Sequence, residues 1–87
     1  MERLLSNKVC IITGAAQGIG KSIAERFAGD GAIVYACDRQ EGSMEDWAEQ
    51  CAAANDTRVV PLYFDVTDAA AVKSAFMSVF KQEGRID

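Results

Sequence analysis

The chain has 87 residues, a formal net charge of −4 and no histidine, and 49% of its residues are hydrophobic. This length allows one small domain, in which only about 60 to 65% of the surface of the unfolded chain becomes buried. The nine Lys and Arg residues are scattered along an acidic chain, so we exclude nucleic acid as a partner.

The first half of the chain predicts a strand, a helix and a second strand. Residues 8–13, KVCIIT, form a β-branched apolar run that ends at a glycine, which predicts a buried strand. Residues 18–30 predict a helix that a glycine turn closes. Residues 32–37, AIVYAC, predict the second strand. The apolar residues of the helix share one face: Ile19, Ile23, Ala24, Phe27 and Ala28.

A second helix is expected after Ser43. Ser43 is of a type that accepts hydrogen bonds from the first helical N–H groups, and Asp46 follows three residues later, so we expect Ser43 to be the N-cap. Apolar residues then repeat with a helical spacing, which predicts that they face the core. They are Met44, Trp47, Ala48, Cys51 and Ala52.

The last third of the chain predicts an edge strand and a helix. Residues 58–64, RVVPLYF, predict a strand, and Pro61 inside it cannot donate to a ladder, which places this strand at a sheet edge. Thr67 or Asp68 is the expected cap of the final helix, and Gly84 is its expected end. Its predicted apolar face consists of Val72, Phe76, Val79 and Phe80.

Strands that alternate with helices predict an α/β fold with a parallel sheet and right-handed crossovers. With the proline strand at the edge, the strand order becomes 3-2-1, which is the first βαβαβα half of a Rossmann-type doubly wound sheet. Residues 86–87 fall where a fourth strand would begin. We therefore expect residues 1–87 to be the N-terminal, dinucleotide-binding part of a single Rossmann-type domain whose remainder is absent from this chain.

The sequence shows no sign of export or membrane insertion. No apolar run approaches the roughly 18 residues that cross a bilayer, and the start, MERLLSNK, lacks the apolar core of a signal peptide. We expect a cytoplasmic protein with no membrane partner. Cys10, Cys37 and Cys51 have no CxxC spacing and lie in apolar patterns, which favours reduced core thiols over a disulfide or a metal site.

Residues 13–22, TGAAQGIGKS, allow two interpretations that predict different chemistry. A triphosphate-binding loop needs a glycine five positions before Gly20, but Ala15 stands there and Gly14 is one residue off. A dinucleotide-binding loop needs a tight turn at Gly14, close approach of the backbone to a pyrophosphate at Gly18, and close helix packing at Gly20. The start of the helix would offer free N–H groups to the phosphates. The motif alone still leaves open a glycine-rich turn that binds nothing.

Two acidic residues at the ends of later strands support the dinucleotide interpretation. Asp38 stands 18 residues after Gly20, near the roughly 20 at which an acidic residue meets the adenosine ribose. Asp65 ends the third strand in the same way, although by itself it is more typical of a cap or a turn. The carboxyl ends of parallel strands meet at one sheet edge, so these loops should lie together.

The chain resembles the classical short-chain dehydrogenases/reductases along essentially all of its length. The resemblance rests on residues 13–20 (TGAAQGIG), 37–39 (CDR), 65–68 (DVTD) and 84–87 (GRID). It implies a nicotinamide dinucleotide bound by the glycine loop at its pyrophosphate, by the end of the second strand at its adenosine ribose, and by the end of the third strand at its adenine. The residues so implied are Gly14, Ala15, Ala16, Gln17, Gly18, Ile19 and Gly20, then Asp38 and Arg39, then Asp65 and Val66.

The resemblance also shows what this chain lacks. Family members continue with an Asn-Ala-Gly turn, a catalytic Ser and a Tyr-x-x-x-Lys pair, but Tyr35 is followed four places later by Arg39 and Tyr63 by Thr67. We expect no catalytic residue here, and no activity of the 87 residues alone, because a tyrosine acid needs a neighbouring cation. The resemblance implies that the full-length protein is an NAD(P)(H)-dependent oxidoreductase that interconverts a small carbonyl compound and an alcohol, as a homo-oligomer. The alternative is a stand-alone, non-catalytic adenine-nucleotide-binding module or an inactive partner subunit.

Asp38 also bears on which dinucleotide is used. Its carboxylate would repel a 2′-phosphate, which favours NAD(H) over NADP(H). The neutral Gln17 agrees, since NADP-preferring relatives often place a basic residue there. Arg39 points the other way, because a guanidinium can clamp a phosphate, but we expect it to pair locally or to stack on the adenine.

Overall fold

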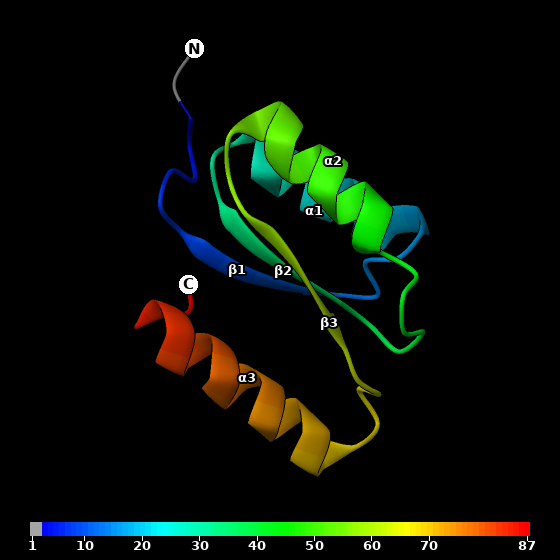
Figure 1. Ribbon diagram of the computed structural model, residues 1–87. Helices are drawn as coiled ribbons and strands as arrows, with labels where there is room; N and C mark the ends of the chain where they lie inside the picture. Colours follow the sequence, from blue (N-terminus) through cyan, green and yellow to red (C-terminus); the bar gives the residue numbers. More distant parts are fainter. Residues whose placement is uncertain (1–2) are drawn as a thin grey trace.

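The computed structural model describes residues 3–87, in which three parallel strands alternate with three helices (Figure 1). The strands lie in the order β1-β2-β3, so β2 is central and the proline-containing β3 is at an edge. The α/β class and the 3-2-1 half of a doubly wound sheet are confirmed. The elements are β1 Val9–Thr13, α1 Gly18–Gly29, β2 Ile33–Asp38, α2 Glu45–Asn55, β3 Val59–Tyr63 and α3 Ala69–Glu83.

Helices cover both faces of this sheet. In Figure 1, α1 and α2 lie on one face and α3 lies on the other. Successive residues of β2 serve the two layers in turn: Val34 and Ala36 belong to the core under α1 and α2, whereas Tyr35 packs with Val9 and Val79 under α3. A strand buried on both faces must be apolar throughout rather than alternating, which explains the continuous apolar run of this segment.

The contact stripe of α1 is narrower than the sequence predicts. Ala24 and Ala28 are completely buried, which agrees with the prediction, but Ile19 is 80% exposed and Ile23 is 39% exposed. A helix touches a sheet along one stripe, and here that stripe follows the two alanines, whose small side chains allow close packing. The apolar face predicted from the sequence is therefore only partly covered, because its residues Ile19 and Ile23 remain exposed.

The start of α2 differs from the prediction as well. Ser43 is not the N-cap: that position belongs to Met44, and the Ser43 hydroxyl donates instead to the carbonyl of Gln40 at 2.6 Å. The Ser43 hydroxyl thus stabilises the turn that precedes α2. The Met44 N–H donates to the phenolic oxygen of Tyr63 at 3.1 Å. Three of the predicted core residues of α2 are buried: Met44, Ala48 and Cys51.

The last helix begins and ends where the sequence predicts. The Asp68 carboxylate accepts hydrogen bonds from the amides of Ala70 and Ala71, both at 3.1 Å, and Gly84 ends the helix in the left-handed region with φ +81°. The predicted apolar face is only partly covered: Val79 is buried, whereas Phe76 and Phe80 are 38% and 58% exposed. These two rings line an open apolar hollow of about 870 Å³ along α3.

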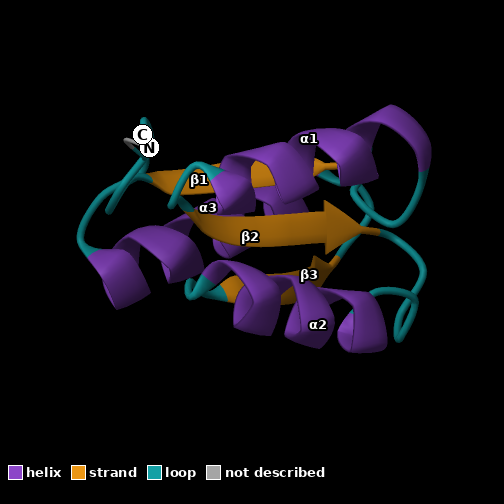
Figure 2. Cartoon of the chain, turned by 90° about the horizontal axis from the view of Figure 1, so that it is seen from above, coloured by secondary structure: helices purple, strands orange, loops and turns teal. Residues whose placement is uncertain are grey.

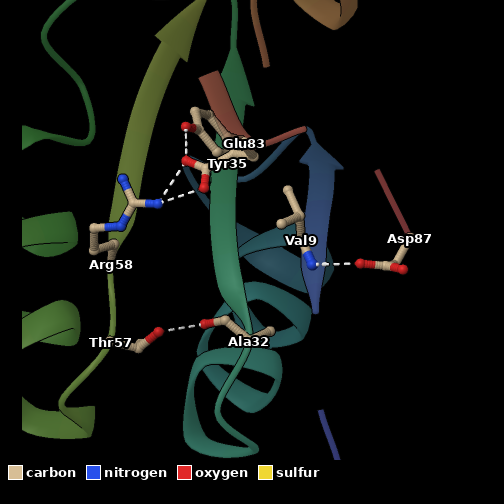
Figure 3. A network of polar contacts seen from close by, with 7 residues as sticks. All are labelled: Val9, Ala32, Tyr35, Thr57, Arg58, Glu83 and Asp87. Atoms are coloured by element: carbon tan, nitrogen blue, oxygen red, sulfur yellow. Dashed lines mark hydrogen bonds and ion pairs between the residues drawn. The ribbon is translucent and has the colours of Figure 1, made fainter. Parts of the chain in front are cut away.

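The carboxylate of Glu83 fixes the C-terminal end of α3 to the sheet (Figure 3). The side chain of Glu83 is 8% exposed. The Arg58 guanidinium donates to both of its oxygens at 2.6 Å, and the Tyr35 hydroxyl donates to one of them. These hydrogen bonds, that from Arg58 first, lower the pKa of Glu83. Burial and the bond to Glu83 raise the pKa of Tyr35 to about 12. The Glu83 carboxylate is therefore partly shielded from solvent and is paired through both of its oxygens.

The last residue of the chain lies beside the first strand (Figure 3). The Asp87 N–H donates to the Val9 carbonyl at 2.8 Å, and the Val9 N–H donates to the Asp87 carboxylate at 2.8 Å. Both groups of Val9 thus point away from β2. Because backbone groups alternate in direction along a strand, those of Ile11 and Thr13 face the same outer side of β1.

The pairing of Tyr35 with Glu83 predicts the effect of Tyr35→Phe. This substitution should lower the free energy of unfolding by about 1 kcal/mol at pH 7, because it removes one hydrogen-bond donor and keeps the ring and the Arg58–Glu83 pair. The pKa of Tyr35, about 12 when folded, exceeds that of an unfolded tyrosine, about 10. The hydroxyl therefore contributes stability that is fully present below about pH 10 and is lost as the pH rises toward 12.

Urea unfolding at a series of pH values between 7 and 11.5 measures this contribution. The Tyr35→Phe variant should lose less stability than the parent protein over the alkaline part of the series. Parallel curves for the two proteins across the whole series would contradict the assigned role of the hydroxyl.

Candidate functional site

The three strands end at the same edge of the sheet, and their arrowheads point to one side in Figure 2. The loops that follow these ends enclose a small cavity of about 190 Å³. Five of the residues selected from the sequence line it, so the structure brings together groups from all three strand ends. The lining residues are Gly14, Asp38, Arg39, Phe64, Asp65, Val66 and Thr67.

The glycine loop between β1 and α1 requires glycine at three positions. Gly14 and Gly18 have φ angles of +65° and +63°, a region that other residues enter at a cost. At Gly20 the constraint is space, since a Cβ there would lie 2.1 Å from the carbonyl oxygen of Gly14. The first turn of α1 therefore rests directly on the backbone of the loop, which is the close packing that the sequence predicts at Gly20.

The first turn of α1 leaves its amide groups available. Gln17, the N-cap, is extended and its side chain makes no capping hydrogen bond, and the first turn contains no acidic residue. Free N–H groups and the positive end of the helix dipole therefore face the loop, an arrangement that suits an anion. A Cβ built on Gly18 meets nothing within 4 Å, so the space over this backbone is open.

Asp38, the last residue of β2, contacts the glycine loop through its side chain. One carboxylate oxygen accepts a hydrogen bond from the Ala16 N–H at 3.0 Å, and the other accepts one from the Arg39 N–H at 2.7 Å. Ala15 adds a backbone contact, because its N–H donates to the Cys37 carbonyl at 3.0 Å. Each carboxylate oxygen has two acceptor positions, so Asp38 keeps capacity for an external donor.

Asp65 and Arg39 join the ends of β3 and β2. The backbone N–H and the hydroxyl of Thr67 donate to the Asp65 carboxylate at 2.9 and 2.8 Å, and these bonds lower its pKa. The Arg39 guanidinium lies 3.6 Å from the other oxygen of Asp65. Arg39 thus pairs with Asp65, which follows the neighbouring strand, rather than with the adjacent Asp38. The pair is exposed to solvent, which screens the attraction, so it contributes little to the stability of the fold.

Some features of the site escape the sequence analysis. Phe64 and Thr67 line the cavity but were not selected, although the Asp65-Val66-Thr67 spacing is typical of a turn in which an aspartate binds the backbone two residues later. Lys21, which a triphosphate loop would need at the phosphates, lies over the Trp47 ring at 5.7 Å from its centroid. This position agrees with the dinucleotide interpretation of the loop.

Two further properties concern residues 3–87 as a whole. Nowhere in this range do three or more His, Cys, Asp or Glu side chains gather as metal ligands would. Among the helices of the same range, none combines the length and apolarity that crossing a membrane requires.

Comparison with known proteins gives a consistent family match. Residues 8–87 match the family model described as short chain dehydrogenase. The 3-oxoacyl-[acyl-carrier-protein] reductase of Thermotoga maritima is 39% identical over 83 residues, which are 95% of this chain and 33% of that protein. The meso-2,3-butanediol dehydrogenase of Serratia marcescens is 37% identical over 86 residues, with 93% of this chain and 31% of that protein covered.

Solved structures agree with the sequence match. The L-sorbose reductase of Gluconobacter frateurii, solved in complex with NADPH and L-sorbose, superposes with a TM-score of 0.90 at 33% sequence identity. The match covers 100% of this chain and 33% of that one. The chain thus spans about a third of the length of the relatives it matches.

The contact between Gly20 and Gly14 predicts the effect of Gly20→Ala. The added methyl group has no room beside the Gly14 carbonyl, so the loop or the helix must shift, and we expect a loss of about 1 to 3 kcal/mol in the free energy of unfolding. Gly29→Ala is the matched control in the same helix, because its Cβ would lie 3.7 Å from the Asn55 side chain, an ordinary contact. The control should be neutral or slightly stabilising. Equal urea midpoints for the two variants would contradict this account of the loop.

Proposed function

The chain belongs to the short-chain dehydrogenase family, and from this premise we propose that residues 1–87 are the cofactor-binding part of an NAD(P)(H)-dependent oxidoreductase. The whole protein would interconvert a small carbonyl compound and an alcohol. The observation that carries this proposal is the convergence of the glycine loop, Asp38 and Asp65 at one sheet edge around a shared cavity.

The glycine loop suits the pyrophosphate of a dinucleotide. Gly14, Ala15, Ala16, Gln17, Gly18, Ile19 and Gly20 form the loop and the first helical turn, which is uncapped by any side chain and contains no acidic residue. The open space over Gly18 lets a phosphate approach the backbone, and the first-turn amides provide donors. Ile19, which is 80% exposed, adds an apolar surface beside the loop.

The adenosine half would occupy the cavity beside the loop. The Asp38 carboxylate would accept hydrogen bonds from the ribose hydroxyls, with its remaining acceptor capacity. Arg39, Asp65 and Val66 line the adjoining wall, where they would contact the adenine. The nicotinamide group, when bound, supplies or accepts the hydride, while the role of residues 1–87 is to hold and orient the dinucleotide.

We propose NAD(H) as the preferred dinucleotide. The carboxylate of Asp38 would repel a 2′-phosphate on the ribose that it contacts. Arg39, the cation best placed to clamp such a phosphate, lies against Asp65 instead. Family membership leaves this choice open, since the L-sorbose reductase was solved with NADPH.

The cofactor preference is the direct test of the proposed role of Asp38. We expect the protein that contains residues 1–87 to prefer NAD(H) over NADP(H) by roughly 30-fold to 1000-fold in kcat/KM, equivalent to about 2 to 4 kcal/mol. Asp38→Ser should reduce or reverse this ratio because it removes the repulsion. Asp46→Ser, on the exposed first turn of α2, should leave the ratio unchanged. Equal or better use of NADP(H) by the unmodified protein would refute the assignment.

Neither tyrosine of this chain is placed to act as the proton donor of a reductase. The Tyr35 hydroxyl donates to Glu83 and has a pKa raised to about 12, and the Tyr63 oxygen accepts the Met44 N–H. We therefore assign no catalytic residue to residues 1–87, and place the chemistry elsewhere in the protein.

Residues 1–87 expressed alone should accordingly show no nicotinamide-dependent turnover. A spectrophotometric assay at 340 nm with a panel of ketones and alcohols measures this, and the protein that contains these residues serves as the positive control. Hydride transfer by the purified 87 residues, free of contaminating enzyme, would show that the proton donor lies within them after all.

A further inference from the structure

The glycine loop is fastened to β2 by two hydrogen bonds of different kinds. The Ala15 N–H donates to the backbone carbonyl of Cys37 at 3.0 Å, and the next N–H along the chain, that of Ala16, donates to the Asp38 side chain at 3.0 Å. Only the second bond depends on the identity of a side chain. It joins residues that are 22 positions apart, and it is partly buried.

The segment that these bonds hold is prone to move without them. Gly14 and Gly18 stand at its two ends, both at positive φ, and glycine has more backbone freedom than any other residue. Ala15 is completely buried and serves as one anchor, while Ala16 and Gln17 lie further along the loop. A carboxylate that accepts a backbone N–H makes a charge-assisted bond, which is stronger than one between neutral groups.

We propose that Asp38 is a positioning residue for the glycine loop, in addition to its role at the adenosine ribose. Through the Ala16 N–H it holds the loop in the shape that faces the pyrophosphate. This inference rests on the proposed function, and it extends the influence of Asp38 to a part of the dinucleotide that its side chain does not touch. Loss of the Asp38 carboxylate should therefore have two effects. It should lower the affinity of the loop for the pyrophosphate of both NAD and NADP, and it should separately remove the repulsion that disfavours NADP.

The two roles of Asp38 separate when the ligand lacks the hydroxyls that the carboxylate would bind. In 2′,3′-dideoxyadenosine-NAD⁺ the pyrophosphate is intact, but the adenosine ribose offers no hydroxyl donor. If Asp38 acts only on the ribose, Asp38→Ala should have no effect on the affinity for this analogue. If Asp38 also positions the loop, part of the loss should persist.

We would measure dissociation constants of NAD⁺ and of the dideoxy analogue by calorimetry, with the protein that contains residues 1–87 and with its Asp38→Ala variant. The expected result is an affinity for the analogue about tenfold weaker in the variant, the size expected for loss of a hydrogen bond to a charged group, and a still larger loss for NAD⁺. Equal affinity of both proteins for the analogue, within about twofold, would overturn the positioning role.

Amide hydrogen exchange in the ligand-free protein provides a second measurement that does not depend on binding. The Ala16 N–H should exchange faster in Asp38→Ala than in the parent protein, while the Val34 and Ala36 amides in β2 should keep their protection and so confirm that the variant is folded. Asp38→Asn retains one carbonyl oxygen and should recover part of the Ala16 protection. Asp46→Ala, which changes a carboxylate remote from the loop, should leave Ala16 unchanged.

The two measurements distinguish the failure of this inference from the failure of the proposed function. A protein that binds neither ligand but shows faster Ala16 exchange in Asp38→Ala would refute dinucleotide binding and support the positioning of the loop. Unchanged Ala16 exchange in a folded Asp38→Ala variant would refute the positioning of the loop whatever the ligands do. If the β2 amides of Asp38→Ala lose their protection from exchange, this variant is not folded. The affinity and exchange measurements on Asp38→Asn then test whether residue 38 positions the loop.

Discussion

The contact between Gly20 and the carbonyl of Gly14 is the constraint on which the rest of the site depends. Because the helix and the loop meet with no side chain between them, the first turn of α1 comes down onto the end of β1. The loop therefore lies against the end of β2, where the Ala15 N–H donates to the Cys37 carbonyl and the Ala16 N–H donates to the Asp38 carboxylate. One missing Cβ thus places the free helical amides beside the acidic end of the neighbouring strand.

The order of elements and the position of the site follow from local patterns in the sequence. Apolar runs and helical spacings are local, and parallel strands bring their carboxyl ends together, so Gly14, Asp38 and Asp65 could be selected as neighbours without a structure. Pro61 placed its strand at an edge for a similarly local reason, the lack of an N–H. Predictions of this kind need only the chain and the rules of sheet topology.

The errors have a different origin, because each depends on a contact that sequence spacing does not contain. Ser43 is a residue type that often caps helices, but here its hydroxyl donates a hydrogen bond to the Gln40 carbonyl instead. The spacings of Ile23 and Phe80 identify an apolar side of each helix, yet they do not reveal how much of that side another element covers. The bond from Ala16 to Asp38 spans 22 positions, and no local pattern marks it.

The pairing of Asp87 with Val9 has a consequence for the assembly of the sheet. One residue occupies both backbone groups of Val9 on the outer side of β1, the amide through its carboxylate and the carbonyl through its own N–H. A one-residue slip in pairing would turn every side chain of an incoming strand to the opposite face. The two hydrogen bonds between Asp87 and Val9 define how an adjacent strand would align with β1. A strand that continued from Asp87 would therefore have its register fixed before the remaining hydrogen bonds to β1 form.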